Sequence, residues 1–380
     1  MVKSSLLTIG TNMVSIITTV RHNIGDDFVR EGILSILSDV SKFDKVELIH
    51  KHSPVTTAYG YEGIRKLRVS RLVEPVLRIL GTKDRIADAN LLVQSGAPVY
   101  WCHNDGPHCA DNEWFDPLVR KRFLNDRRSR KFLNIAGGSC QRYHSDGSEV
   151  TNCPKCKAYI AEFFDACDLT LLRDSMAQRM LQLAGRDAAV LPCTSIFARD
   201  HFKIAPAKGG YIVVNFMEIG GHYTFGQSID ALKWRKNFVE IVHRLQPHGR
   251  VVAACHNAAE EMLAKQIVPD VETYIVPDEH VAFMNFYAGA RFAIVNRVHA
   301  GFMMASFGKP AAVIGNDSRA LMIENLNLTP YYVEDVTSEL IDQMIDELHA
   351  REESYLDEIE SIRAAARSDY VDAISKVLQS

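Results

Sequence analysis

The 380-residue sequence lacks any apolar run of about eighteen residues, the length that a membrane-spanning helix requires. Long blocks of like charge are also absent and the formal net charge is only -4, which argues against a nucleic-acid partner. Solenoid repeats and low-complexity tracts are missing as well. These absences favour a small-molecule partner, while a peripheral membrane contact and the oligomeric state stay open.

The N-terminal segment has no small-residue cleavage site of the kind that ends a secretory signal. It is fairly apolar, but Gly10, Asn12 and Ser15 interrupt it. We therefore interpret this segment as a first buried strand. A chain of this kind is expected in the cytoplasm.

Short β-branched runs that alternate with helical periodicity are abundant. Apolar residues recur at helical spacing from Phe28 to Val40, which predicts a crossover helix between the first two runs. Strands that are apolar on both faces and separated by helices form parallel sheets covered on both sides. The predicted strands are 14–20, 46–50, 90–94, 132–136, 168–172 and 189–192, then 211–216, 251–255, 273–277, 292–296, 311–315 and 331–335.

The second set of strands repeats the pattern of the first, and 47% hydrophobic residues are enough for more than one core. We therefore predict an α/β fold with two Rossmann-like domains facing a cleft, over residues 1–205 and 206–348. The break falls near Pro206, Gly209 and Gly210, and the chain beyond about residue 337 is predicted to form two terminal helices, with 349–380 as a helical tail. Ligands of such sheets bind beyond the carboxyl ends of the strands, so the site is expected in the loops there.

One candidate segment, Asn23-Ile24-Gly25-Asp26, follows the first predicted strand and begins its helix. Gly25 permits a close approach of the backbone, and the exposed amides of a helix start can hold an anion or a sugar hydroxyl. The alternative is that Asp26 or Asp27 only caps the helix.

A second candidate segment, Asn296-Arg297-Val298-His299, follows the strand 292–296. Arginine presents a fixed fork of donors to a carboxylate or phosphate, and histidine exchanges a proton near neutral pH. Together they indicate an anionic substrate and a proton-dependent reaction. The alternative is that Arg297 pairs with a buried carboxylate and His299 caps the helix.

Three segments of the chain resemble the polysaccharide pyruvyl transferases. That family carries an N-x-G-D loop after the first strand, an R-D-x-x-S-like segment in mid-chain, and an R-x-H followed by a small-residue helix and G-x-P. The corresponding segments here are Asn23-Ile24-Gly25-Asp26, Leu172-Arg173-Asp174-Ser175, and Arg297-Val298-His299 with Gly308-Lys309-Pro310. Their order and spacing match over nearly the whole chain.

The resemblance implies a GT-B-like fold with the acceptor on the N-terminal domain and the donor on the C-terminal one. It further implies phosphoenolpyruvate as donor and a glycan or lipid-linked sugar as acceptor, in exopolysaccharide biosynthesis. Two sugar hydroxyls add to the enol carbon and phosphate leaves, so the reaction needs cations and a proton donor but no metal or other cofactor.

On this resemblance, Arg173 and Arg297 are expected to hold the carboxylate and the phosphate of the donor. His299 is expected to deliver a proton or bind phosphate, and Asp26 to orient or activate an acceptor hydroxyl. Asn23, Gly25 and Ser175 complete the predicted substrate contacts.

The cysteines are clustered, which in a reducing compartment favours metal binding over disulfides. Cys140, His144, Cys153 and Cys156 have the spacing of a tetrahedral zinc site. Cys102, His103, His108 and Cys109 form a second set, and either loop could complete a site with the other. The alternative is a group of small apolar thiols beside a proline-led helix start.

Two rival functions stay open at this point. The same two-domain architecture serves glycosyltransferases that use a nucleotide sugar, since a fold does not fix a function. A non-catalytic glycan-binding protein of this fold is the other alternative, although Arg173, Arg297 and His299 together favour an enzyme.

Overall fold

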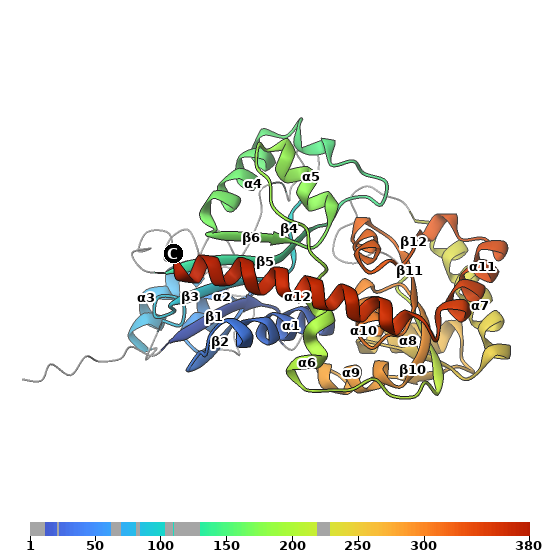
Figure 1. Ribbon diagram of the computed structural model, residues 1–380. Helices are drawn as coiled ribbons and strands as arrows, with labels where there is room; N and C mark the ends of the chain where they lie inside the picture. Colours follow the sequence, from blue (N-terminus) through green and yellow to red (C-terminus); the bar gives the residue numbers. More distant parts are fainter. Residues whose placement is uncertain are drawn as a thin grey trace, which may run out of the picture.

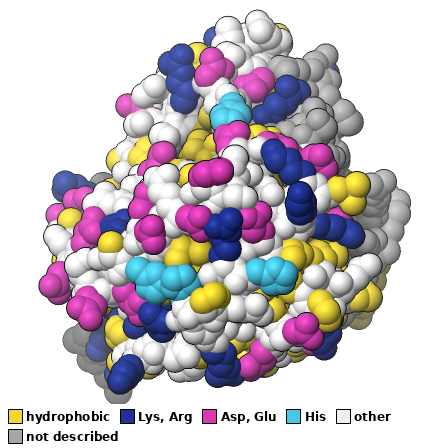
Figure 2. All heavy atoms as spheres, turned by 90° about the vertical axis from the view of Figure 1, so that its right-hand side faces the viewer, with side chains coloured by type: hydrophobic (Ala, Val, Ile, Leu, Met, Phe, Trp, Pro, Cys, Tyr) yellow, Lys and Arg dark blue, Asp and Glu magenta, His cyan; other side chains and the backbone are white. Residues whose placement is uncertain are grey.

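The computed structural model describes residues 12–20, 23–61, 70–80, 84–102, 109, 130–218 and 229–380. These residues form two parallel sheets, one in each half of the chain, with helices packed around them (Figure 1). No helix of these ranges is both long and apolar enough to cross a bilayer. On the face shown in Figure 2, acidic and basic side chains are interspersed, as the small net charge leads one to expect.

The N-terminal sheet is built around β1 (Met13–Thr18), whose six residues are all buried. β1 pairs in parallel with β2 (Lys45–His50) on one side and with β3 (Leu91–Ser95) on the other. The sheet continues through β5 (Lys131–Ser139) to β4 (Pro98–Tyr100) and β6 (Leu169–Leu172). The C-terminal sheet is also parallel, in the order β12 (Pro330–Tyr332), β11 (Ala311–Gly315), β10 (Ala290–Val295), β7 (Tyr211–Asn215), β8 (Val251–Ala254) and β9 (Glu272–Tyr274).

Several helices begin just beyond a strand, where a polar side chain accepts a hydrogen bond from a free backbone amide. Asn23 caps α1 (Ile24–Val40), Asp174 caps α5 (Ser175–Leu183) and Asn257 caps α8 (Ala258–Ile267). The remaining helices are α2 (Pro54–Ala58), α3 (Ser70–Leu80), α4 (Pro154–Ala166), α6 (Ala198–His201), α7 (Ala231–Leu245), α9 (His280–Ala288), α10 (Val298–Ser306), α11 (Ser338–Arg351) and α12 (Tyr355–Gln379). Short 3₁₀ segments include η4 (Thr194–Phe197) and η6 (Ser318–Leu326).

The largest of the three apolar core clusters spans both halves, which therefore do not meet only at their surfaces. The largest core cluster joins Phe28 of α1 to Phe302 and Met303 of α10 and to Tyr355 and Tyr370 of α12. Gly32 of α1 lies against η4 so closely that a Cβ there would sit 1.8 Å from the carbonyl oxygen of Thr194. The region between the sheets is therefore tightly packed.

The last helix, α12, lies across both halves of the molecule (Figure 1). Near its start, the Tyr355 hydroxyl donates to the carbonyl of Leu326 in the C-terminal half, at 2.9 Å. Farther along, Arg363 donates to Asp200 at 2.6 Å, and the Tyr370 hydroxyl donates to the carbonyl of Pro192 at 3.0 Å, both in the N-terminal half. The segment expected to be a separate tail is thus part of the shared core.

Eleven of the twelve predicted strands overlap an observed strand, although 273–277 and 331–335 end early, at Tyr274 and Tyr332. The exception is 189–192, where Val190 makes only an isolated bridge to Leu172. Pro192 ends that run and has no amide to continue a ladder. The three-residue β4 is a strand that was not predicted, because its run is too short to show a periodicity. The two predicted terminal helices are α11 and α12.

Candidate functional site

A cavity of about 210 Å³ lies between the two halves, at the carboxyl ends of strands from both sheets. Six of the residues predicted from the sequence line it, namely Asn23, Gly25, Asp26, Arg173, Arg297 and His299. Ser175 does not, because it is the first residue of α5 and its side chain is exposed to solvent. The other lining residues are Lys51, Pro98, Met217, His256, Asn296, Val298, Gly315, Asn316, Asp317, Arg319 and Ala320.

Asp26 lies in the first turn of α1 and is buried. Its Oδ2 accepts a hydrogen bond from Thr19 Oγ1 at 2.5 Å and forms an ion pair with Lys51 Nζ at 3.0 Å. Burial alone would raise the pKa of Asp26, but the charge of Lys51 and the hydrogen bond from Thr19 outweigh it and hold the pKa below its usual range. Asp26 is therefore an ionised hydrogen-bond acceptor, and Asn23, not Asp26, caps the helix.

Gly25 brings the helix start against the ring of His299. A Cβ at this position would lie 2.6 Å from His299 Nδ1 and 3.1 Å from its Cγ, so a larger residue would displace the ring. The N-x-G-D segment and the R-x-H segment, from opposite ends of the chain, thus meet in direct contact.

His299 is also in contact with Arg173, which donates from Nη1 to His299 Nε2 at 3.4 Å. Because arginine only donates, this contact places the proton of a neutral imidazole on Nδ1. Burial and then the charge of Arg173 lower the pKa of His299 to about 3, although Asp26 acts in the opposite direction. At neutral pH, His299 is uncharged in the structure.

Arg173 follows β6 and is 1% exposed. Gly138 makes room for it, since a Cβ on Gly138 would lie 2.5 Å from Arg173 Nε. That Nε has no hydrogen-bond partner within the described ranges. Asp174, next in the chain, is occupied as a cap and accepts from Ser139 and Ala177.

The other cations of the cavity each have a carboxylate partner. Lys51 pairs with Asp26, Arg319 pairs with Asp317 at 2.6 Å, and Arg297 pairs with Glu260. Among the described residues, Arg173 has no carboxylate within salt-bridge distance. Of the cationic side chains that line the cavity, Arg173 is therefore the one whose charge is not neutralised by a carboxylate of the described residues.

Arg297 follows the alternative considered from the sequence, because its Nε donates to the buried Glu260 at 2.8 Å. Burial raises the pKa of Glu260, but the Arg297 charge outweighs this effect and the pKa is lowered. Glu260 also accepts from the amide of His256 at 2.9 Å and from Asn257 at 2.8 Å. Arg297 itself occupies the capping position of α10, so His299 is not the cap.

His256, Lys51 and Arg319 line the cavity but were not among the predicted site residues. Lys51 follows a strand, which is the signal that could have found it. His256 also follows a predicted strand, but a single histidine there is more often a loop or capping residue than a ligand. His256 Nε2 is 2.8 Å from the Tyr287 hydroxyl, and its buried Nδ1 has no partner in the part of the chain that the structure describes. Burial and then the Arg297 charge lower the pKa of His256 to about 3.

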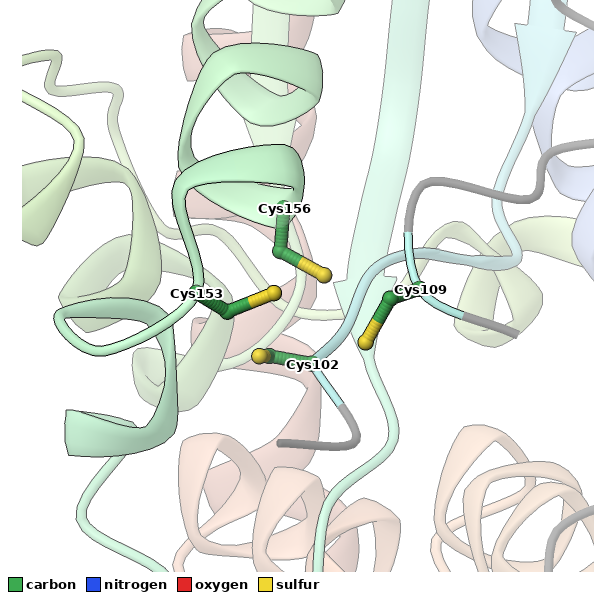
Figure 3. A group of neighbouring side chains, drawn as sticks. All are labelled: Cys102, Cys109, Cys153 and Cys156. Atoms are coloured by element: carbon green, nitrogen blue, oxygen red, sulfur yellow. The ribbon is translucent and has the colours of Figure 1, made fainter. Parts of the chain in front are cut away.

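The cysteines gather in a set different from the main one predicted. Cys102, Cys109, Cys153 and Cys156 have their sulfur atoms within 4.8 Å of one another (Figure 3). Cys140 is buried elsewhere, where burial and then the Asp317 charge raise its pKa, and the exposed His144 packs on Tyr143 and Tyr332. His103 and His108 of the second predicted set lie outside the described residues.

No protein-family model and no curated protein sequence matches the chain. Among solved structures, MnaA of S. aureus in a structure with UDP is similar, with a TM-score of 0.57, 14% identity and 97% of each chain covered. The UDP-GlcNAc 2-epimerase of Methanocaldococcus jannaschii is similar with a TM-score of 0.51 and 9% identity, over 88% of this chain and 92% of that chain. At such identities the similarity shows the fold. The predicted GT-B fold of two Rossmann-like domains is confirmed.

Proposed function

We propose that this chain is a carbohydrate-modifying transferase that holds the anionic group of an activated donor in the cavity between its domains. The observation that carries the proposal is Arg173, a buried guanidinium without a carboxylate partner in the described chain and beside a neutral His299. A buried charge without a partner is costly, and a phosphate or carboxylate of a ligand would supply the missing charge. The free Nε of Arg173 is a further donor for such a ligand.

For the donor, we propose phosphoenolpyruvate. Support comes from the residues that resemble the pyruvyl transferases, because Asp26, Arg173 and His299 are far apart in the sequence and line one cavity. In the overall reaction, one sugar hydroxyl oxygen bonds to the enol carbon while the methylene carbon gains a proton. A second hydroxyl oxygen then bonds to the same carbon as the C–O bond to phosphate breaks. Of the two hydroxyl protons, one balances the new methyl group and the other leaves with the phosphate.

The charge states of the site suggest a division of work. Asp26 has a lowered pKa, so it is a weak base and is better suited to orient an acceptor hydroxyl than to remove its proton. His299 is neutral before the donor arrives. A phosphate next to it would favour the imidazolium, so His299 could hold the proton that the reaction needs once the donor is bound.

A nucleotide sugar is the second candidate donor, and the structural comparisons favour it over phosphoenolpyruvate. Of the two similar proteins, one forms a structure with UDP and the other is a UDP-GlcNAc 2-epimerase. The diphosphate of a nucleotide sugar would meet the same need at Arg173. In that case the reaction would be glycosyl transfer or a change within the sugar.

The test compares phosphoenolpyruvate, UDP-GlcNAc, UDP and inorganic phosphate as ligands in thermal-shift and calorimetric measurements. The preferred donor should raise the melting temperature by ligand linkage. Arg173→Gln should weaken its binding by about tenfold to a hundredfold, the effect of a lost charged hydrogen bond. Arg186→Lys is the matched control, because Arg186 forms an exposed pair with Asp165.

Incubating the protein with each donor and a panel of sugar acceptors identifies the reaction. Phosphate release with a product heavier by one pyruvyl group supports the first donor, and release of UDP supports the second. If none of the four ligands stabilises the protein, or if Arg173→Gln binds them as the wild type does, the proposal is wrong.

A further inference from the structure

The strongest unassigned feature outside the cavity is the group formed by Cys102, Cys109, Cys153 and Cys156, called the four-cysteine cluster below. Its members come from two parts of the N-terminal domain. Cys102 lies just beyond β4, with Cys109 farther along the same connection, whereas Cys153 and Cys156 stand at the start of α4. Figure 3 shows the four side chains turned toward one another.

The spacing of the sulfur atoms matches one metal ion. Zinc bound by four thiolates has Zn–S bonds of about 2.3 Å in a tetrahedron, which places the sulfurs about 3.8 Å apart. The four sulfurs of the cluster lie within 4.8 Å of one another, so small side-chain adjustments would bring them to these positions. Each residue supplies one sulfur, and four ligands leave no open position for a substrate.

The local backbone of α4 explains how two of the four ligands are presented. Cys153 is the residue before the helix, Pro154 is its first residue and Cys156 follows within the first turn. Residues three apart at a helix start lie on one face, so both thiols point the same way. Proline at the first position fixes the turn without losing a hydrogen bond.

Burial separates this cluster from a chance group of surface cysteines. Cys102, Cys153 and Cys156 are at most 2% exposed, and Cys109 is half-buried. None of the four is in a disulfide. Four thiols this close together are arranged to ligate one cation as thiolates, and thiolate sulfur selects zinc over magnesium or calcium.

We propose that the four-cysteine cluster is a structural zinc site that fixes the connection after β4 to the start of α4. This site is separate from the donor cavity, and the proposal does not depend on the proposed function.

The cluster is connected to the boundary between the domains through Gln141. The side chain of Gln141 accepts from the amide of Cys102 at 3.0 Å and donates to its carbonyl at 2.9 Å. The backbone of Gln141 pairs with Ser318 of the other domain, at 2.9 and 3.0 Å. A metal that fixes Cys102 would therefore also hold the segment after β5 that reaches across to η6, next to the cavity residues Asp317 and Arg319.

The experiment measures the metal content of the full chain, purified under reducing conditions without a metal-affinity tag. We expect about one zinc per chain, released when a mercurial reagent titrates the thiols. Cys153→Ser and Cys156→Ser should lose the zinc. Cys167→Ser is the matched control at the other end of α4, because its thiol donates to the carbonyl of Phe163 and a hydroxyl can do the same.

Replacing zinc by Co²⁺ in the wild type provides a second readout that does not depend on whether the serine variants fold. Tetrahedral thiolate ligation should give a characteristic visible spectrum, and removal of the metal by a chelator should lower the melting temperature. The proposal is overturned by protein that contains no metal, by zinc that persists in Cys153→Ser, by iron in place of zinc, or by two disulfides among these four cysteines.

Discussion

Gly25→Ala tests whether the contact between the first helix and His299 shapes the site. The new Cβ would lie 2.6 Å from His299 Nδ1, whereas an ordinary contact begins at about 3.4 Å, so the ring must withdraw by about 0.8 Å. The 3.4 Å contact between His299 Nε2 and Arg173 is already at the limit of a hydrogen bond. A displacement of about 1 Å at a catalytic group can reduce turnover on the order of a hundredfold.

The same substitution should leave folding nearly unchanged. Gly25 lies in a helix at an ordinary φ, and Ala there removes freedom from the unfolded chain, which stabilises by about 0.4–1 kcal/mol. The atoms that must move belong to one side chain. We therefore expect a melting temperature close to that of the wild type together with a defective site.

Two other glycines serve as controls for Gly25→Ala. Gly32→Ala, in the same helix, would place a Cβ 1.8 Å from the backbone oxygen of Thr194, so it should lower stability by about 1–3 kcal/mol. Gly210→Ala meets no atom within 4 Å and should change nothing. Melting temperature, donor affinity and the NMR signals of the His299 ring are measured for each variant. Unchanged His299 signals with normal turnover in Gly25→Ala would refute the reasoning.

Three further predictions concern the charges of the cavity. A bound phosphate should raise the pKa of His299 from about 3, so donor binding near pH 7 should be accompanied by the uptake of a proton. Calorimetry in buffers of different ionisation enthalpy measures this uptake. His299→Gln should abolish the uptake. Without ligand, between pH 6.5 and about 3, His256 and His299 bind fewer protons in the folded state than in the unfolded state. The free energy of unfolding should therefore fall as the pH is lowered through this window. A pH-independent stability there would contradict the assignment. Asp26→Asn leaves the buried Lys51 without its partner and should cost about 3–5 kcal/mol of unfolding free energy in denaturant titrations, most of which the double variant with Lys51→Met should restore. Equal stability of the single and double variants would contradict that coupling.

The sequence was sufficient for the fold because buried parallel strands are read from short apolar runs between helices. It was insufficient where the signal is carried by very few residues, as in β4, or where proline ends a run, as at Pro192. Ser175 was predicted to contact the substrate because it follows Arg173 and Asp174 in the chain. In a helix start, however, successive side chains point in different directions, so Ser175 faces solvent while Arg173 faces the cavity.

The sequence predicted which residues lie at the strand ends of the candidate site. It did not predict which side chains pair with one another there. The partner of Arg297 is Glu260 of α8, and nothing in the local sequence of either residue identifies the other. The cysteines give the same lesson. Cys153 and Cys156 could be read as a pair from their helix start, but the choice of Cys102 over Cys140 depends on where β4 and β5 end in space.

The course of α12 has a mechanical consequence for the cavity. The chain crosses between the domains twice, once in the segment that leads from α6 to β7 and once through α12. The two domains are therefore linked at two places. α12 has 25 residues and is about 37 Å long. It is hydrogen-bonded to the carbonyl of Leu326 near its start and to the carbonyl of Pro192 farther along. Twisting or sliding of one domain past the other would break these hydrogen bonds. No residue of α12 lines the cavity, yet its contacts tie together the two halves that enclose it.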